Sequence, residues 1–423
     1  MAKLDFGKGD TAQVAIVTGA ARGIGRTWAL ALAARGARVV VNDNDPNQRL
    51  VDDVVAAIES KGGVAIADYH SVVDGAKIVA TAMKSFGRVD ILINNATIIR
   101  DGSFWKMSVE NWDAVYKSSL FGTFVTTQAV WPIMRKQKYG RILNCISGAG
   151  LYGNFGQVNY AAMKMGLVGF TVALNQEGIK YNIQVNAISP VAGTRLTEPV
   201  MPKEIHDALT PELTAPIVVY LAHSSCKEAG SLFELGGGWA GKLRIQRTHG
   251  VGFPTDPSQF TPELVAEQWK AVADFSRVTH PSTTQESFEP MMRNIKSPPT
   301  SLTTSRSNEC TEVFHRLRDV LRVEGAALAK QINGVMEWHI NKETWTVSLI
   351  NGQGSVVEGK DPRFTPDLVI DMDERDFLDL ASGKLRLQQA LIRKRLRAHG
   401  NMKLAMKLQP LEELFHRHSH AKL

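Results

Sequence analysis

Hydrophobic residues follow two alternating patterns over the first 240 positions. Short β-branched runs at residues 14–17, 39–41 and 91–93 are typical of buried strands. Longer Ala- and Leu-rich stretches, with apolar residues at helical spacing, lie between these runs and indicate helices. The alternation predicts an α/β fold in which helices cover both faces of a doubly wound parallel sheet.

The pattern changes after residue 240. The strand signal fades over residues 241–290, where Thr261 and Pro262 combine an N-cap residue with a proline at the first helical position, so we expect a helix to begin there. Residues 296–307 are rich in Ser, Thr and Pro and cannot bury much surface. They predict an exposed linker.

A second unit follows the linker. Its pattern predicts a helix at residues 313–332 and then an alternating strand at 338–349, with Trp345, Val347 and Leu349 on one face. A turn with a returning strand follows at 351–357, and two further helices lie at 373–381 and 387–396. This order is typical of a small α+β domain. We therefore expect four parts: a first domain with a C-terminal extension at 1–295, a linker at 296–309, a small domain at 310–415 and a flexible tail at 416–423.

Composition excludes several classes of protein. Hydrophobic residues make up 44% of the 423 residues and charged residues 22%, which excludes a wholly disordered, collagen-like or low-complexity chain. No apolar run approaches the roughly 18 residues that span a bilayer, so we expect no transmembrane segment. The N-terminus lacks the apolar stretch of a secretion signal. Cys145, Cys226 and Cys310 are too far apart for a disulfide framework or a metal site, so we expect no metal and a reducing intracellular setting.

The basic charge lies at the C-terminal end. The net charge is +7, and residues 383–423 hold ten basic and two acidic side chains. Residues 393–397 could form a nucleic-acid patch, but such a run is more often the solvated face of a helix, with Leu391, Ile392 and Leu396 on the buried side. We expect no nucleic-acid partner, because anionic acyl-CoA or membrane lipid fits this charge better.

A glycine-rich segment follows the first predicted strand and opens a helix. Such a turn brings the backbone close to a pyrophosphate and presents the helix N-terminus to it, whereas the alternative is an ordinary glycine-rich turn. We expect a dinucleotide site in a Rossmann-type fold, with the candidate residues Thr18, Gly19, Arg22, Gly23, Ile24 and Gly25.

Asp43 ends the next predicted strand, about 20 residues after the glycines. A carboxylate at this place meets the adenosine ribose hydroxyls and repels a 2′-phosphate, which favours NAD over NADP. The alternative is a solvated loop acid, and Asp45 is a competing candidate.

Tyr160 and Lys164 are four residues apart and share one face of a predicted helix. A nearby cation stabilises a phenolate, so it lowers the pKa of the tyrosine toward the range useful for acid–base catalysis. Ser147 follows a strand-like run, where its hydroxyl could hydrogen-bond a substrate oxygen. The alternatives are a surface pair and a turn residue.

Together these residues resemble the short-chain dehydrogenase/reductase family in order and spacing. The glycine turn, Asp43, Asn94, Asn95, Ala96, Ser147, Tyr160 and Lys164 carry the resemblance. It implies that Tyr160 exchanges a proton with the substrate hydroxyl, that Lys164 contacts the nicotinamide ribose, and that Ser147 orients the substrate. It also places Asn95 and Ala96 in the cofactor site. Ser119 stands where the family has the Asn or His that holds a water of the proton relay.

A narrower resemblance is to the peroxisomal multifunctional enzyme type 2 family. Residues 150–160, 190–195, 233–239 and 244–247 carry it. It implies NAD-dependent oxidation of (3R)-3-hydroxyacyl-CoA to 3-ketoacyl-CoA in peroxisomal fatty acid β-oxidation by a homodimer. The second unit resembles a sterol carrier protein type domain at residues 376–384 and 400–410, which implies a lipid ligand. Residues 421–423, Ala-Lys-Leu, are a variant of the S-K-L signal and predict binding by the peroxisomal import receptor.

The sequence departs from these families at several positions. It leaves no room for the hydratase domain that full-length members carry, so we expect a separate hydratase to supply the substrate. Thr97 replaces a glycine and would be strained if its φ were positive. His70 stands where an aspartate usually contacts the adenine. With Ser119, these departures support an alternative hypothesis: a lipid- or acyl-CoA-binding carrier whose dehydrogenase domain is weak or inactive.

Overall fold

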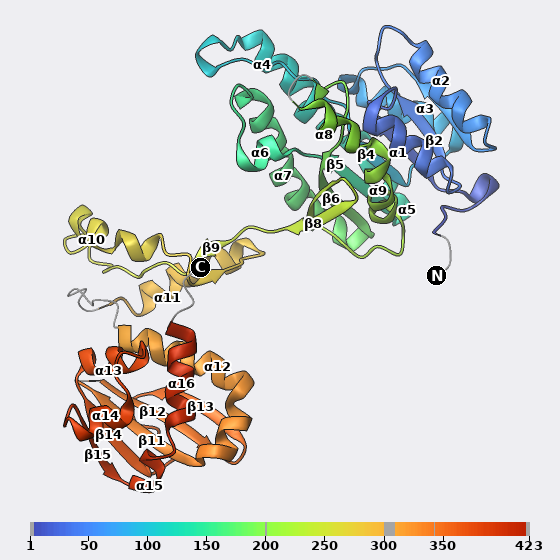
Figure 1. The fold of residues 1–423 in the computed structure, drawn as a ribbon. Coiled ribbons are helices and arrows are strands. Elements are labelled where there is room, and N and C mark those ends of the chain that lie inside the picture. The colour runs from blue at the N-terminus through green and yellow to red at the C-terminus, as the bar shows by residue number, and fades with distance from the viewer. Residues whose placement is uncertain (1–3, 199–200, 300–308, 342, 420–423) are drawn as a thin grey trace. The chain divides into compact units, whose positions relative to one another are not determined.

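The computed structural model describes residues 4–198, 201–299, 309–341 and 343–419 (Figure 1). Its internal contacts divide the chain into two compact units, Met1–Arg247 with Val278–Pro281, and Thr248–Arg277 with Ser282–Leu423. Most of the segment that we expect to extend the first domain is thus grouped with the second unit. The predicted functional boundary at residue 295 stays a prediction.

The first unit contains an eight-stranded sheet in the order β3-β2-β1-β4-β5-β6-β7-β8. Its strands are β1 (Val14–Thr18), β2 (Arg38–Asn42), β3 (Val64–Asp68), β4 (Ile91–Asn94), β5 (Gly140–Cys145), β6 (Ile183–Val191), β7 (Leu232–Gly236) and β8 (Trp239–Leu243). All neighbours pair in parallel except β7 and β8, which are antiparallel. The predicted doubly wound α/β fold is confirmed.

Helices cover both faces of this sheet (Figure 1). The helical elements of this unit are α1 (Gly23–Ala33), α2 (Arg49–Glu59), α3 (Gly75–Phe86), α4 (Val109–Tyr116), the π-helical turn η4 (Lys117–Phe121), α5 (Gly122–Gln137), α6 (Gly148–Tyr152), α7 (Val158–Gly178), α8 (Lys203–Ala208) and α9 (Ala215–Ala222). Of these, α1, α2 and α9 pack on one face of the sheet and α3, α5 and α7 on the other. Short 3-10 turns lie at Gly9–Thr11, Val72–Asp74, Phe104–Lys106, Ile179–Tyr181 and Pro211–Thr214.

The β-branched runs are buried because each strand faces two helical layers. On β1, Ala15 and Val17 pack into the core formed with α1, α2 and α9, whereas Val14 and Ile16 pack into the core formed with α3 and α5. Successive strand residues point to opposite faces, so a strand covered on both sides must be apolar throughout. Chain order reverses between β1 and β4, and folds of this kind bind ligands in the crevice outside the carboxyl ends of the strands at such a point.

The segment between residues 244 and 299 holds short elements. These are β9 (Arg247–Thr248), α10 (Pro262–Val272), β10 (Val278–Thr279) and α11 (Thr284–Lys296). The predicted helix start is confirmed, since Thr261 caps α10 by accepting a hydrogen bond from the Leu264 N–H at 3.3 Å.

The small α+β domain is also confirmed. Its sheet has the order β13-β12-β11-β14-β15. The elements are α12 (Glu309–Ile332), β11 (Gly334–Ile340), β12 (Glu343–Ile350), β13 (Gln353–Glu358), β14 (Leu368–Met372), α13 (Glu374–Ala381), α14 (Leu387–Ile392), β15 (Leu396–Gly400), α15 (Met402–Ala405) and α16 (Gln409–Ser419). The Phe314 ring is central to the core and stacks on Trp345 and Phe377 at 4.8 and 4.9 Å.

The predicted helix at 387–396 is too long. It ends at Ile392, because Lys394 adopts a left-handed backbone with φ of 56°, which cannot continue a right-handed helix. Of the three residues expected on its buried side, Ile392 is 81% exposed, whereas Leu396 is buried and Leu391 packs against the core. Leu396 lies in β15, so the prediction of one continuous basic helix is wrong, and so is the prediction that Ile392 is buried. Arg395 forms ion pairs with Asp376 and Asp379.

No helix in the described residues is both long and apolar enough to cross a membrane. The same residues contain no cluster of His, Cys, Asp and Glu side chains arranged to hold a metal ion.

Candidate active site

The glycine-rich turn between β1 and α1 is closely packed. Gly19 and Gly23 have left-handed φ values of 64° and 53°, which favour glycine. A Cβ on Gly25 would lie 2.3 Å from the Gly19 carbonyl oxygen, so no side chain fits there. No side chain caps the N-terminus of α1, which leaves its first N–H groups available to a pyrophosphate. The turn therefore fits the phosphates of a dinucleotide.

Two residues join this turn to the end of β4. The Thr18 hydroxyl accepts hydrogen bonds from the N–H groups of Asn95 and Ala96 at 3.0 and 3.1 Å. The Asn95 side-chain amide donates to the carbonyl oxygens of Thr18 and Gly19 at 2.9 and 3.0 Å. Thr18, Asn95 and Ala96 thus hold together the two sides of the crevice.

Arg22 and Ile24 flank the left-handed Gly23. Arg22 is the N-cap residue of α1 and forms an ion pair with Asp45 at 2.6 Å. Ile24 lies in the first turn of α1 and packs partly buried against the core. The pairing with Arg22 gives Asp45 a structural role and leaves Asp43 as the better ribose candidate.

Asp43 follows β2 and points toward the glycine turn. Its carboxylate accepts hydrogen bonds from the N–H groups of Ala21 and Asp45, both at 3.2 Å. Burial raises the pKa of Asp43, and these hydrogen bonds oppose that shift. The carboxylate is thus positioned beside the turn, where a ribose would lie.

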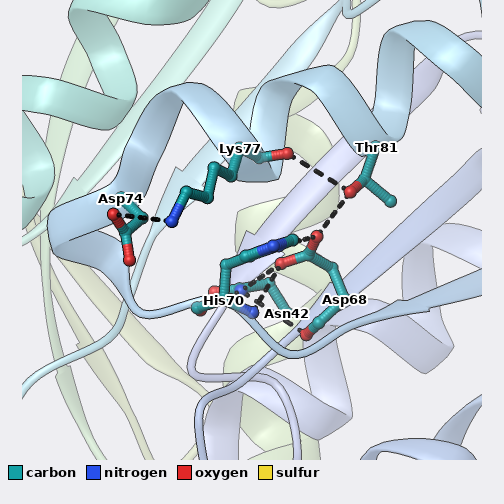
Figure 2. A network of polar contacts seen from close by, with 6 residues as sticks. All are labelled: Asn42, Asp68, His70, Asp74, Lys77 and Thr81. Atoms are coloured by element: carbon teal, nitrogen blue, oxygen red, sulfur yellow. Dashed lines mark hydrogen bonds and ion pairs between the residues drawn. The ribbon is translucent and has the colours of Figure 1, made fainter.

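His70 belongs to a polar network at the end of β3 (Figure 2). Its Nδ1 lies 3.0 Å from a carboxylate oxygen of the buried Asp68. Asn42 donates to that carboxylate and to the His70 carbonyl oxygen, both at 2.8 Å, and the Thr81 hydroxyl donates to Asp68 at 2.6 Å. The sequence departure at His70 is therefore accommodated by an ordered set of partners.

Helix α7 carries Tyr160 and Lys164 on one face. The Asn159 side chain fixes the helix start, since it accepts from the Tyr160 N–H at 2.8 Å and donates to the Arg100 carbonyl at 2.9 Å. Lys164 is buried, and its Nζ donates to the Cys145 carbonyl at 2.7 Å and lies 5.3 Å from the centroid of the Tyr160 ring. Because Lys164 is buried and Tyr160 is half-buried, the predicted pair is not a surface pair.

Burial dominates the electrostatics of this pair. It raises the pKa of Tyr160 to about 12, although the nearby hydroxyls of Ser147 and Thr97 lower it by stabilising the phenolate. Burial lowers the pKa of Lys164 to about 8. Both shifts favour the neutral forms, as expected for ionisable groups removed from water.

Ser147 follows β5 and caps α6. Its hydroxyl accepts a hydrogen bond from the Ala149 N–H at 3.2 Å, and it lies close enough to Tyr160 to influence the phenol. The structure thus brings Ser147, Tyr160 and Lys164 together around the end of β5, with Lys164 bound to the last carbonyl of that strand.

Ser119 and Thr97 form a pair. Ser119 is 1% exposed, lies in η4, and its Oγ is 2.7 Å from the Thr97 Oγ1. Thr97 is absent from the residues with positive φ, so the strain that we considered does not arise.

Two loops with exposed aromatic residues adjoin the candidate catalytic residues. The Gly102 N–H donates to the Gly156 carbonyl at 2.8 Å, which joins the loop after β4 to the loop before α7. Phe104, Trp105 and Phe155 on these loops are 72%, 81% and 91% exposed. Exposed aromatic side chains on two joined loops suit an apolar ligand.

The two units match two known families. The family model "short chain dehydrogenase" matches residues 13–205, and "SCP-2 sterol transfer family" matches residues 314–413. Peroxisomal multifunctional enzyme A of Dictyostelium discoideum is 40% identical over 433 aligned positions, which cover 94% of this chain and 97% of that protein. The chain belongs to the peroxisomal multifunctional enzyme family. Its first unit has the short-chain dehydrogenase fold, and its second unit contains an SCP-2 type domain at residues 314–413.

Members of the family differ in length. Peroxisomal multifunctional enzyme type 2 of Mus musculus is 48% identical over 282 positions, which cover 65% of this chain but only 38% of the mouse protein. The chain therefore spans almost all of the Dictyostelium relative and about two fifths of the mouse one.

A solved relative bears on the cofactor. The 7α-hydroxysteroid dehydrogenase complexed with NADH and 7-oxo glycochenodeoxycholic acid aligns with a TM-score of 0.50 and 28% identity, and covers 53% of this chain and 93% of that one. The present chain shares the short-chain dehydrogenase fold and has a glycine turn that fits a dinucleotide. Both features support a nicotinamide cofactor.

Sequence reasoning missed three contributors to the site. The Cys145 partner of Lys164 is a backbone carbonyl, which any residue would supply, so the sequence carries no signal for it. Asn159, next to Tyr160, could have been noticed as a fully buried polar residue only after the helix was placed. At Thr97 the sequence indicates only a possible source of backbone strain, because the partner of its hydroxyl, Ser119, lies 22 residues away.

Proposed function

We propose that the chain is an NAD-dependent (3R)-3-hydroxyacyl-CoA dehydrogenase of peroxisomal fatty acid β-oxidation. The observation that carries this proposal is the grouping of Ser147, Tyr160 and the buried Lys164 in a chain that matches a peroxisomal multifunctional enzyme over almost its whole length. The exposed aromatic loops beside Tyr160 fit a fatty acyl substrate better than a polar one.

The chain's residues divide the proton chemistry of an alcohol oxidation. Tyr160 takes the proton of the substrate hydroxyl, and Ser147 donates a hydrogen bond to the same oxygen as it becomes a carbonyl. The Lys164 cation favours the phenolate form of Tyr160. A nicotinamide bound in the crevice supplies the hydride acceptor for substrate C3. Eight residues would hold that cofactor, either by direct contact or by shaping the glycine turn: Thr18, Gly19, Arg22, Gly23, Ile24, Gly25, Asn95 and Ala96.

The choice of NAD rests on Asp43. A carboxylate beside the glycine turn accepts hydrogen bonds from ribose hydroxyls and repels a 2′-phosphate. Replacing Asp43 by Ser should weaken NAD binding and narrow the preference over NADP. Equal binding of NAD and NADP to the unmodified protein would contradict the assignment.

The decisive experiment follows NADH formation from purified protein, NAD and a (3R)-3-hydroxyacyl-CoA, with the (3S) epimer as the control. We expect turnover of the (3R) substrate alone. Turnover of neither epimer by a protein that binds acyl-CoA but shows no thermal shift with NAD would instead support the lipid-carrier hypothesis.

Further partners follow from the family. We propose a lipid ligand in the SCP-2 type domain, because the matching family model is named for sterol transfer. The chain is assigned to the peroxisome, because the relatives named above are peroxisomal enzymes. The homodimer is proposed from the family resemblance alone. Residues 421–423, which we predict to bind the import receptor, lie outside the described residues.

A further inference from the structure

Two hydroxyl side chains from different elements meet beside the catalytic tyrosine. Thr97 lies in the loop after β4, and Ser119 lies 22 residues later in the π-helical turn η4. Their side-chain oxygens are 2.7 Å apart, which is the usual length of a hydroxyl–hydroxyl hydrogen bond. The tertiary structure, and not the local sequence, creates this pair.

Packing fixes the position of the pair. The turn η4 lies against α7, the helix that carries Tyr160, and a Cβ added to Gly166 of α7 would lie 3.2 Å from the Leu120 side chain. Ser119 is buried next to Leu120, so its hydroxyl has little freedom to turn toward water. A π-helical turn within a helix is often found at functional sites.

The pair also influences Tyr160. Groups from several elements face the phenol: Ser147 and Thr97 lower its pKa, Cys145 and Asp101 raise it, and the Lys164 ammonium lies over its ring. Thr97 is thus a second hydroxyl beside the phenol, in addition to Ser147. Ser119 reaches Tyr160 only through Thr97, because its described hydrogen bond is to Thr97.

We propose that the Thr97–Ser119 pair is a positioning element for the Tyr160 proton: Ser119 donates to the Thr97 oxygen, and Thr97 donates to the Tyr160 oxygen. A hydroxyl has one proton, so a donor on the Thr97 oxygen directs the Thr97 proton toward the phenol. The substrate proton ends on the Tyr160 oxygen, and the pair itself changes no covalent bond. This inference rests on the proposed function, in which Tyr160 acts as the base.

The test compares variants that remove or keep the hydroxyls. Thr97→Val removes the donor but keeps the branched shape, and should shift the acid limb of the pH profile of kcat/KM upward by about one pH unit, a tenfold loss on that limb. Thr97→Ser should keep the original profile. Ser119→Ala should shift it less, and should add nothing to Thr97→Val, because it acts through Thr97.

A matched control removes a comparable hydroxyl elsewhere. Thr346 of the second unit donates to the Gly359 carbonyl at 2.8 Å, so Thr346→Val should leave the pH profile unchanged. Should Thr97→Val fail to fold in a thermal melt, Ser119→Ala with Thr97→Ser carries the same test. Unchanged profiles in Thr97→Val and Ser119→Ala would overturn the proposal.

A second readout separates this inference from the proposed substrate. In protein carrying ¹³C-labelled tyrosine and bound NAD, the ring-carbon resonance that Tyr160→Phe removes reports ionisation of Tyr160 without turnover. A higher midpoint in Thr97→Val than in the parent supports the pair even if no hydroxyacyl-CoA is oxidised. An identical midpoint overturns the pair even if the dehydrogenase is active.

Discussion

The Lys164 ammonium lies 5.3 Å from the centroid of the Tyr160 ring, one helical turn away on α7. The same ammonium donates to the Cys145 carbonyl at the end of β5, so the helix is held against the sheet where Ser147, Tyr160 and Lys164 meet. The proposed roles of Tyr160 and Lys164 in proton transfer depend on this arrangement, and so do the predictions below.

Removing the phenol should abolish catalysis but not folding. Tyr160→Phe should reduce turnover by roughly 10²–10⁴-fold, since Tyr160 is the base of the proposed mechanism. Circular dichroism should match the parent. The control is Tyr152→Phe, which loses only an exposed hydrogen bond to Glu234. A Tyr160→Phe variant with nearly full activity would refute the mechanism.

Oxidation and reduction should respond differently to pH. Burial raises the pKa of Tyr160 to about 12, so the phenolate needed for oxidation is scarce at neutral pH and increases as the pH rises. The neutral phenol needed for reduction is already abundant there. The initial rate of oxidation should therefore rise from mildly acidic to mildly alkaline pH, whereas the initial rate of reduction should not. Parallel profiles would show that another group controls the proton.

The buried Lys164 should destabilise the fold in a pH-dependent way. The pKa of Lys164 falls from 10.5 to about 8 on folding. Between these two pH values the unfolded chain therefore binds more protons than the folded chain. Lys164 thus adds a contribution to the free energy of unfolding that rises with pH. Lys164→Met removes this contribution. The difference in unfolding free energy, parent minus Lys164→Met, should therefore increase from about pH 8 to 10.5 in denaturant titrations. A flat difference would contradict the burial of this charge.

A side chain on Gly25 should damage the cofactor turn. Its Cβ would lie 2.3 Å from the Gly19 oxygen and 2.6 Å from the Asn95 amide, so Gly25→Ala should cost about 1–3 kcal/mol and weaken NADH binding. Gly169 on α7 has no atom within 4 Å of its added Cβ. Gly169→Ala should therefore stabilise by about 0.5–1 kcal/mol and leave binding unchanged, as measured by fluorescence titration and thermal melts.

The aromatic loops should contribute to acyl binding. Phe155→Ala should raise KM for long-chain substrates more than for short-chain ones, because it removes apolar contact area and leaves Tyr160 in place. Phe288→Ala, at an exposed phenylalanine of the second unit, is the matched control. Equal effects on all chain lengths would exclude these loops as the acyl site.

Local patterns in the sequence determined the main strands of the first unit and the type of its cofactor site. The β-branched runs predicted the buried strands, because a strand covered on both faces has no polar side. The glycine turn and the four-residue spacing of Tyr160 and Lys164 predicted a dinucleotide site and a shared helical face, since both depend only on neighbouring residues.

The tertiary structure decided what depends on distant segments. Three contacts join different elements: the Thr97–Ser119 pair, the bond from Lys164 to the Cys145 carbonyl, and the bond from Asn42 of β2 to the His70 carbonyl after β3. These contacts follow from the order of the strands and the packing of the helices. Lys394 has a left-handed backbone and ends α14 early, although the residues around it have a composition that is typical of a helix. Short-range periodicity reports which face of an element is buried, whereas only the packed fold decides which side chains meet across it.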